Sequence, residues 1–338
     1  MMRVTDDLAR FPRAPLMTAV TPLERLDRLS AHLDIDLWLK RDDLSGLGMG
    51  GNKVRQLEFY LGEALSEGAD TILITGAVQS NYLRTAAAAA AKLGMQAVLQ
   101  LEERVPDMGA TYHASGNVLL AQILGAEHMH FPVGEDEAGA DQALHDRASI
   151  LNSQGRKPYV IHLGLGHPPL GALGYVMCAD ELLQQMSDFD VAVVPSGSGQ
   201  THAGFLTGLR LAGTTAPVHG ICVRRDADQQ RARIGTVLRD IAELVDVDPN
   251  LAGDGVLVWD HALPPGYGRV SDQTRSALEL MARMEGIFLD PVYSAKTFAG
   301  LLMLLEEGRV KKGQRVVMIH TGGQPALFGY QDELHLCP

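Results

Sequence analysis

The sequence predicts an α/β protein with open, largely parallel sheets that carry helices on both faces. Strand-like and helix-like segments alternate along almost the whole chain, which is the pattern of α/β folds with parallel strands. The strand-like segments are short apolar runs, partly β-branched, and the helix-like segments repeat apolar residues at helical spacing. No internal repeat or low-complexity linker interrupts this order.

The elements can be predicted one by one. A short apolar segment at 37–39, followed by charged residues, predicts a strand. Further strands are predicted at 71–75, 97–101, 159–163, 191–194, 218–223, 256–259 and 316–319. Helices are predicted at 54–67, 83–93, 116–124, 141–152, 170–185 and 227–245. The alanine run at 86–91 favours a helix that packs closely against its neighbours. The turns at 164–169 and 263–268 are candidate junctions between larger units.

Composition excludes several classes of protein. The 338 residues are 46% apolar and 21% charged, which is ordinary for a globular protein with a substantial core. The net charge of −12 without a basic cluster argues against nucleic-acid binding. No apolar run reaches the roughly 18 residues that span a bilayer, so we expect no membrane partner. Asp6 and Asp7 argue against a signal peptide, and the scattered Cys178, Cys222 and Cys337 fit a reducing cytoplasm.

A glycine-rich turn at 46–51 enters the helix predicted from residue 54, and Lys53 stands at the entry. Four glycines in six residues leave room for a flat ligand against the backbone. A lysine fixed there and withdrawn from water has a lowered amine pKa and can attack a carbonyl. The alternative is a solvated lysine in an ordinary helix-starting loop. The glycines also fit the letters of a dinucleotide fingerprint, but no acidic residue closes the next strand.

Three loops follow predicted strands and therefore lie where open α/β sheets bind ligands. Residues 76–82 contain Ser80 and Asn81, which could contact an anion or simply cap a helix. Residues 195–204 crowd hydroxyl groups and glycines at a helix start, which favours a phosphate monoester over ATP. Residues 320–328 place Thr321 after a strand, where it would present a neutral hydroxyl to a ligand or form an ordinary turn.

The histidines give no metal signature. His162, His167, His202 and His320 are dispersed without the spacing of metal ligands, so we expect core or loop histidines and no metal site.

The chain resembles a family of pyridoxal-phosphate enzymes, the D-cysteine desulfhydrases and 1-aminocyclopropane-1-carboxylate deaminases. The resemblance covers nearly everything from Arg10 to Tyr330 and rests on motifs that occur in order. They are Lys40-Arg41-Asp42-Asp43, Gly50-Gly51-Asn52-Lys53, Gln79-Ser80-Asn81, Gly171-Ala172-Leu173-Gly174-Tyr175, Thr201-His202-Ala203-Gly204, Pro265-Gly266-Tyr267-Gly268, Asp290-Pro291-Val292-Tyr293 and His320-Thr321-Gly322-Gly323.

The resemblance implies the tryptophan-synthase-β type of fold (fold type II) and pyridoxal 5'-phosphate as cofactor. Residues 1–53 and 164–338 would form a larger domain, with a smaller α/β domain inserted at 54–163. Lys53 would hold the cofactor covalently and move protons. The other implied site residues are Asn81 at the ring hydroxyl, Ser198, Gly199, Gln200 and Thr201 at the phosphate, Thr321 at the pyridine nitrogen, Ser80 at the substrate carboxylate, and Tyr267 and Tyr293 facing the substrate.

The implied reaction is β-elimination from a small amino acid, with D-cysteine as first choice, giving pyruvate, ammonia and sulfide. The deaminase branch has a glutamate and a leucine where this chain has Ser294 and Thr321, which favours the desulfhydrase branch. Cyclopropane deamination, cysteate sulfo-lysis, β-replacement synthesis and an inactive binding protein of the same fold are the alternatives. A cytoplasmic homodimer is implied.

The chain departs from the desulfhydrase pattern at three places near the expected pocket. Tyr82 stands where those enzymes have histidine, and Gln200 enlarges a phosphate loop that is usually built from smaller residues. The segment that begins at Leu165 replaces a Gly-Ser-Asn stretch. These departures bear on the substrate and leave the cofactor assignment unchanged.

Overall fold

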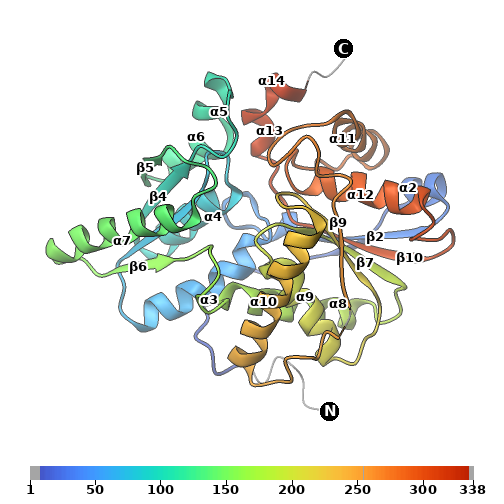
Figure 1. Cartoon of the computed structure of the whole chain (residues 1–338), viewed down its shortest axis with the longest axis horizontal. Coiled ribbons are helices and arrows are strands. Elements are labelled where there is room, and N and C mark those ends of the chain that lie inside the picture. The colour runs from blue at the N-terminus through green and yellow to red at the C-terminus, as the bar shows by residue number, and fades with distance from the viewer. Residues whose placement is uncertain (1–7, 254, 335–338) are drawn as a thin grey trace.

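The computed structural model of the protein describes residues 8–253 and 255–334. Asp6, Asp7 and Cys337, on which the expected compartment partly rests, lie outside these residues, whereas Cys178 and Cys222 are buried free thiols. The described strands form two sheets (Figure 1). In spatial order, one sheet contains β1 (Leu23–Arg25), β2 (Asp36–Arg41), β10 (Arg315–His320), β7 (Val191–Ser196), β8 (Val218–Cys222) and β9 (Val256–Trp259). The other contains β5 (Glu127–Phe131), β4 (Gln96–Glu102), β3 (Thr71–Ala77) and β6 (Pro158–Ile161).

All strand pairs in both sheets are parallel except the edge pair β1–β2. In the larger sheet β2 pairs with β10, so segments almost 280 residues apart lie side by side, with Lys40 opposite Ile319. The strands of the smaller sheet all lie between Thr71 and Ile161. This range falls inside the predicted inserted domain, although α3 packs on α8 as well as on α4. The domain boundary itself stays a prediction.

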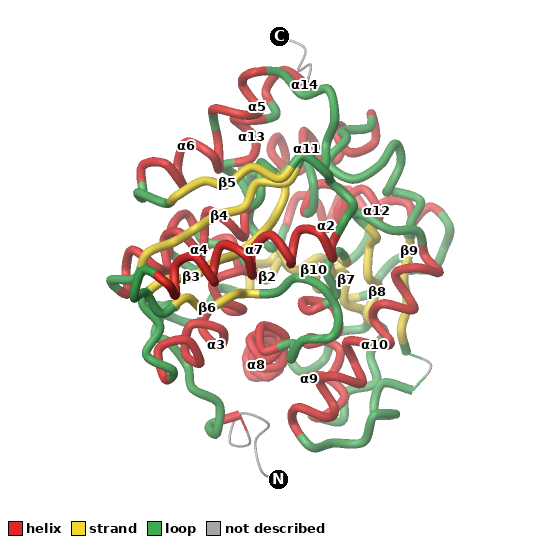
Figure 2. Tube along the Cα trace, turned by 60° about the vertical axis from the view of Figure 1, so that its left-hand side comes forward, coloured by secondary structure: helices red, strands yellow, loops and turns green. Residues whose placement is uncertain are grey.

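The helices cover both faces of each sheet (Figures 1 and 2). They are α2 (Asp27–Leu33), α3 (Lys53–Ser66), α4 (Asn81–Leu93), α5 (Ala110–Ala114), α6 (Gly116–Ile123), α7 (Glu137–Ser153), α8 (Leu170–Gln185), α9 (Gln200–Leu211), α10 (Ala227–Val245), α11 (Asp272–Glu285), α12 (Ser294–Glu306), α13 (Ala326–Gly329) and α14 (Gln331–Leu334). Two short 3₁₀ turns, η1 (Asp42–Leu44) and η2 (Leu47–Met49), precede α3.

The alternation of side chains along the strands explains the layers. In β7, Ala192 and Val194 join the core that includes Phe205 of α9, whereas Val191 and Val193 join a second core with Phe298 of α12. Successive side chains of a strand point to opposite faces of the sheet, so an entirely apolar strand must be covered on both sides. Most of the predicted apolar runs correspond to interior strands, whereas 159–163 and 256–259 correspond to the edge strands β6 and β9.

The structure adds edge strands and further helices, among them α2 and α12, to the predicted elements. β1 and β5 were absent from the predicted strands, because β1 has only three residues and β5, with the sequence Glu-His-Met-His-Phe, carries polar side chains at a sheet edge. The predicted strand 159–163 ends at Ile161, which leaves His162 and Leu163 in the connection to α8. No helix within the described residues combines the length and apolar character needed to cross a membrane.

Candidate active site

A cavity lies at the carboxyl ends of strands from both sheets, where open parallel sheets bind ligands. Gly76 and Ala77 of β3, Pro195 of β7 and Thr321 after β10 contribute to its wall. Nine of the ten site residues predicted from the sequence line it, namely Lys53, Ser80, Asn81, Ser198, Gly199, Thr201, Tyr267, Tyr293 and Thr321. The tenth, Gln200, does not. The fold thus brings together loops that are up to 268 residues apart in the sequence, from Lys53 to Thr321.

Lys53 is the first residue of α3 and the only lysine on the cavity wall among the described residues. The turn before it needs glycine, since Gly51 has φ +114° and a side chain there would meet the Thr321 carbonyl at 3.0 Å. The amide of Asn52 also donates to that carbonyl, at 3.0 Å. These contacts fix the start of α3 against the loop that carries Thr321.

The amine of Lys53 is held inside protein atoms. Its Nζ donates to Oε1 of Gln56 at 3.0 Å and lies 4.5 Å from the centroid of the Tyr82 ring. Burial lowers the pKa of Lys53 from 10.5 to about 7, because the charged ammonium loses its hydration. A large fraction of the amine is therefore neutral near pH 7 and can act as a nucleophile or a base.

Ser80 and Asn81 begin α4 on the cavity wall. The Ser80 hydroxyl caps the helix by accepting hydrogen bonds from the amides of Tyr82 and Leu83 at 3.2 and 3.3 Å. Oδ1 of Asn81 accepts from Nδ2 of Asn117 at 2.8 Å, and its own Nδ2 makes no hydrogen bond among the described residues. The capping role is confirmed for Ser80. Contact of Ser80 and Asn81 with an anion stays a prediction, which their place on the cavity wall permits.

The start of α9 supplies a site for an anion. Gly199 takes φ +106°, which turns the chain so that Ser198, Gly199 and Thr201 line the cavity at the positive end of the helix. Oγ1 of Thr201 accepts from Nδ2 of Asn52 at 2.9 Å and from Nε2 of Gln56 at 3.0 Å. A hydroxyl has two acceptor positions and one hydrogen, so the hydrogen of Thr201 is left for a ligand.

The Gln200 side chain points away from this site. It lines a second, smaller cavity, where its Nε2 donates to the Tyr60 hydroxyl at 2.7 Å. Only its backbone, as the first residue of α9, is available to an anion at the helix start. The sequence showed a bulky residue in the loop, but the direction of its side chain was decided by its partner on α3.

Tyr267 and Tyr293 both line the cavity, and their hydroxyl oxygens are hydrogen-bonded at 2.7 Å. Burial, together with the Tyr267 hydroxyl, raises the pKa of Tyr293 well above 10, so its hydroxyl stays protonated. Asp290 accepts hydrogen bonds from the amides of Tyr293 and Ser294 at 3.0 and 2.7 Å, which fixes the backbone that carries Tyr293. The Ser294 hydroxyl also donates to Asp290, at 2.6 Å, and is not on the cavity wall.

Three arginines complete the cavity and were missed in the sequence, namely Arg104, Arg224 and Arg233. Arg104 is held against the buried Glu102 by two hydrogen bonds, from Nε at 2.8 Å and from Nη2 at 2.7 Å. Arg233 donates to the Ser198 carbonyl at 2.8 Å and to the Leu163 carbonyl at 2.9 Å. Arg104 and Arg224 lie two residues after the ends of β4 and β8. Since open α/β sheets bind ligands beyond the carboxyl ends of their strands, the sequence after these two strands could have indicated both arginines.

The expectation that the histidines are dispersed is wrong for two of the four. The rings of His162 and His167 stack with centroids 3.6 Å apart, because the connection after β6 turns back on itself. The other two are core histidines. Both are buried. Nδ1 of His202 is hydrogen-bonded to the Ser196 hydroxyl at 3.1 Å, and Nε2 of His320 is hydrogen-bonded to the Phe288 carbonyl at 3.1 Å.

The cavity suits a planar aldehyde that carries a phosphate. A neutral amine, a helix start with a free hydroxyl hydrogen and an unpaired amide donor surround one space. An aldehyde requires the amine, a phosphate requires the helix start, and a ring hydroxyl would be met by the Asn81 amide. Pyridoxal phosphate combines these three groups.

Comparison with known proteins agrees with this fit. The chain matches the family of pyridoxal-phosphate dependent enzymes over residues 16–322. It is 39% identical over 336 residues to a D-cysteine desulfhydrase of Yersinia pestis (strain Pestoides F), covering 98% of this chain and 100% of that one. A D-cysteine desulfhydrase of Serratia proteamaculans (strain 568) is 40% identical over 342 residues, with the same coverage.

Solved structures support the fold. The crystal structure of an ACC deaminase homologue matches with a TM-score of 0.88 and 35% identity, covering 99% of this chain and 98% of that one. A threonine deaminase from Solanum lycopersicum shares the fold at a TM-score of 0.64 and 17% identity, over 98% of this chain and 87% of that one. The predicted fold type and the predicted cofactor are confirmed: this chain belongs to the family of pyridoxal-phosphate dependent enzymes.

Proposed function

We propose that this enzyme is a carbon–sulfur lyase that carries out β-elimination on a small β-substituted amino acid. D-cysteine is the first-choice substrate, with pyruvate, ammonia and sulfide as products. The observation that carries the proposal is a single cavity that combines a neutral Lys53 amine, the Tyr267–Tyr293 pair and the uncharged Thr321. The full-length similarity to proteins named D-cysteine desulfhydrase supports the choice of substrate.

In this proposal the residues divide into holding and proton-moving groups. Lys53 would bind the aldehyde, and Ser198, Gly199 and Thr201 with the Gln200 backbone would hold the phosphate. Asn81 would donate to the ring hydroxyl, and Thr321 would lie at the ring nitrogen. The α4 start at Ser80 receives the substrate carboxylate. The bound cofactor withdraws electrons from the substrate α-carbon.

Proton transfer falls to Lys53 and the two tyrosines. Lys53, whose pKa burial lowers to about 7, would take the proton from the substrate α-carbon. The Tyr293 hydroxyl stays protonated and shares a hydrogen bond with Tyr267, so the pair can donate to the departing sulfur. A buried lysine and a hydrogen-bonded pair of tyrosines in one cavity argue against an inactive binding protein.

Thr321 favours elimination over ring opening. Its hydroxyl carries no charge at neutral pH, so it cannot hold a proton on the ring nitrogen by charge pairing. Ser294, which is engaged with Asp290, contributes nothing at this position. A thiolate takes the electron pair with it when it leaves, whereas a cyclopropane ring has no such leaving group and needs a more strongly electron-withdrawing cofactor.

A substrate panel tests this function. We expect keto-acid release from D-cysteine and chloroalanine with kcat/KM at least about 100-fold higher than from 1-aminocyclopropane-1-carboxylate, a difference of about 2.7 kcal/mol in the barrier. A hydrazone assay measures both the three-carbon keto acid from D-cysteine and chloroalanine and the four-carbon keto acid from the cyclopropane acid, and L-cysteine and serine define the handedness and the leaving group. Faster turnover of the cyclopropane acid would contradict the argument from Thr321.

A second candidate, a cysteate sulfo-lyase, is favoured by Arg104. Its Nη1 makes no hydrogen bond among the described residues, and its charge opposes the rise in the pKa of Tyr293. A guanidinium held by Glu102 at the substrate end would suit a sulfonate on the β-carbon. We expect Arg104→Lys, which keeps the charge beside Glu102, to lower kcat/KM for cysteate by about 10- to 100-fold while D-cysteine changes less. Equal losses on both substrates would exclude a sulfonate contact.

Thr201 tests the phosphate site. Thr201→Val removes the donated hydrogen and leaves the buried amides of Asn52 and Gln56 without an acceptor, so we expect both weaker cofactor binding, by about 10-fold, and lower stability. The visible absorbance retained after dialysis measures the cofactor. Thr201→Ser keeps the hydroxyl and serves as the control. Wild-type affinity in Thr201→Val would move the phosphate elsewhere.

The inserted domain at 54–163, the homodimer and the cytoplasmic location are part of the same proposal. Sedimentation velocity of the holoenzyme tests the dimer, and limited proteolysis tests the domain boundary.

A further inference from the structure

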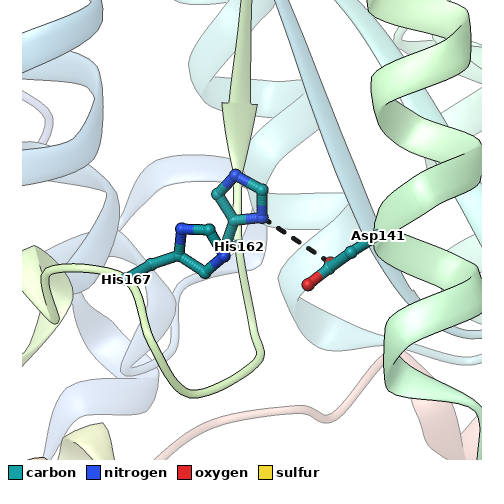
Figure 3. A group of neighbouring side chains, drawn as sticks. All are labelled: Asp141, His162 and His167. Atoms are coloured by element: carbon teal, nitrogen blue, oxygen red, sulfur yellow. Dashed lines mark ion pairs between the residues drawn. The ribbon is translucent and has the colours of Figure 1, made fainter.

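A cluster of metal-binding side chains lies outside the active site, between α7 and the connection from β6 to α8 (Figure 3). Its members are Asp141 of α7, His162 directly after β6, and His167 of the connection. One ligand atom from each lies within 4.8 Å of the others. None of these residues has a part in the proposed reaction.

Two buried polar atoms of the cluster have no hydrogen-bond partner among the residues that the structure describes. They are Nδ1 of His162 and Oδ1 of Asp141, and they face each other at 3.7 Å. This separation is too long for a hydrogen bond. Two ligands of a tetrahedral zinc ion, each about 2.0–2.1 Å from the metal, lie roughly 3.4 Å apart. An ion between the two atoms would satisfy both, which their direct contact does not.

The second imidazole is suited to metal binding. A neutral imidazole ring offers one nitrogen lone pair to a metal ion. The two rings are nearly parallel, at 4°, so His167 must turn to aim a nitrogen at an ion shared with His162. It is exposed and follows Gly166, whose φ is +90°, so the loop gives it room to turn.

A candidate for a fourth ligand lies on the same helix as Asp141, outside the group of three. His145 is four residues after Asp141, and residues at this spacing share one face of a helix. The ring of His145 lies 5.1 Å from that of His162. Three imidazoles and one carboxylate form a donor set that suits zinc and related divalent ions.

We propose that Asp141, His162 and His167, with His145 as the fourth ligand, bind one divalent transition-metal ion of the zinc class. The ion ties α7 to the segment that passes from the smaller sheet to the larger one. Leu163, next to His162, lines the active-site cavity, and Arg233 joins its carbonyl to that of Ser198. An ion in this place therefore stabilises one wall of the cofactor site without touching the cofactor.

Zinc titration of the chelator-treated holoenzyme tests the site. Isothermal titration should give one zinc ion per chain, and zinc should raise the melting temperature because it binds the folded state. We expect His162→Gln and His167→Gln each to weaken zinc binding by at least about 10-fold, the loss that even an outer-sphere partner costs. His32→Gln, which changes an exposed histidine of α2, should bind zinc like the wild type.

The cofactor absorbance and the circular dichroism of each variant establish that it is folded. His167 is exposed, so His167→Gln decides the matter if His162→Gln fails to fold. Cobalt adds an independent signature, because a site with nitrogen and oxygen ligands gives visible bands that His167→Gln should lose. Absence of stoichiometric zinc binding, or equal affinity in wild type and both variants, or the same loss in His32→Gln, would overturn the proposal.

Discussion

Lys53→Ala is expected to abolish the visible absorption of the bound cofactor and to lower kcat/KM by more than about 10³-fold. In the proposed mechanism the variant loses both the covalent anchor and the base that takes the α-proton, and general base catalysis alone contributes about 10²–10⁴-fold. Borohydride should fix the cofactor on the Lys53 peptide in the wild type. The exposed Lys312→Ala is the matched control and should keep both the absorbance and the activity.

The same lysine predicts a pH dependence. Cofactor binding by stripped enzyme requires a neutral amine, and the folded-state pKa of Lys53 is about 7. We therefore expect the rate of reconstitution to fall as the pH drops through about 7, and to level off above it. A rate that rises only near the ordinary lysine value of 10.5 would show a solvated amine. An adduct on Lys40 or Lys296 in the peptide map would show that the anchor is wrongly assigned.

Asp42→Ala is expected to destabilise the fold by about 3–5 kcal/mol, the cost of leaving a buried charge without its partner. Asp42 is fully buried at the end of β2. Its carboxylate accepts from Nε and Nη2 of Arg55 at 2.9 Å each, from the Tyr175 hydroxyl at 2.6 Å and from the Thr21 hydroxyl at 2.8 Å. The substitution removes one of the two carboxylates that pair with the buried Arg55 guanidinium and leaves only Glu181, which accepts from it at 2.9 and 3.0 Å.

Urea unfolding followed by circular dichroism measures the loss. Asp228→Ala is the control, since that carboxylate is almost fully exposed and pairs only with Arg231 across a helical turn. Equal unfolding midpoints of Asp42→Ala and wild type would contradict the role of the network.

The pKa of Asp42 determines how its contribution to the stability of the fold changes with pH. Burial alone would raise the pKa of Asp42, but the charge and hydrogen bonds of Arg55 outweigh burial and hold the pKa below 3.8. The stabilisation is therefore fully present above the unfolded-state value of 3.8 and is lost as the pH falls through the lower folded-state pKa.

Much of the fold could be predicted from local patterns. The central strands are recognisable because an apolar strand must be covered on both faces, as Val193 and Val194 are. The candidate site was predictable for a similar reason. A ligand at the carboxyl ends of the strands requires glycines before Lys53 and small polar residues directly after the apolar strands. These residues are neighbours in the sequence, so a local pattern indicates them.

Only the tertiary structure decided the features that depend on distant partners. Gln200 turns away from the cavity because Tyr60 of α3 meets it, and Ser294 is occupied by Asp290 instead of facing the cavity. His162 and His167 come together with Asp141 because one loop folds back against α7. A side chain's direction is set by whatever packs against it, and a sequence pattern records the side chain but not the neighbour that the fold brings.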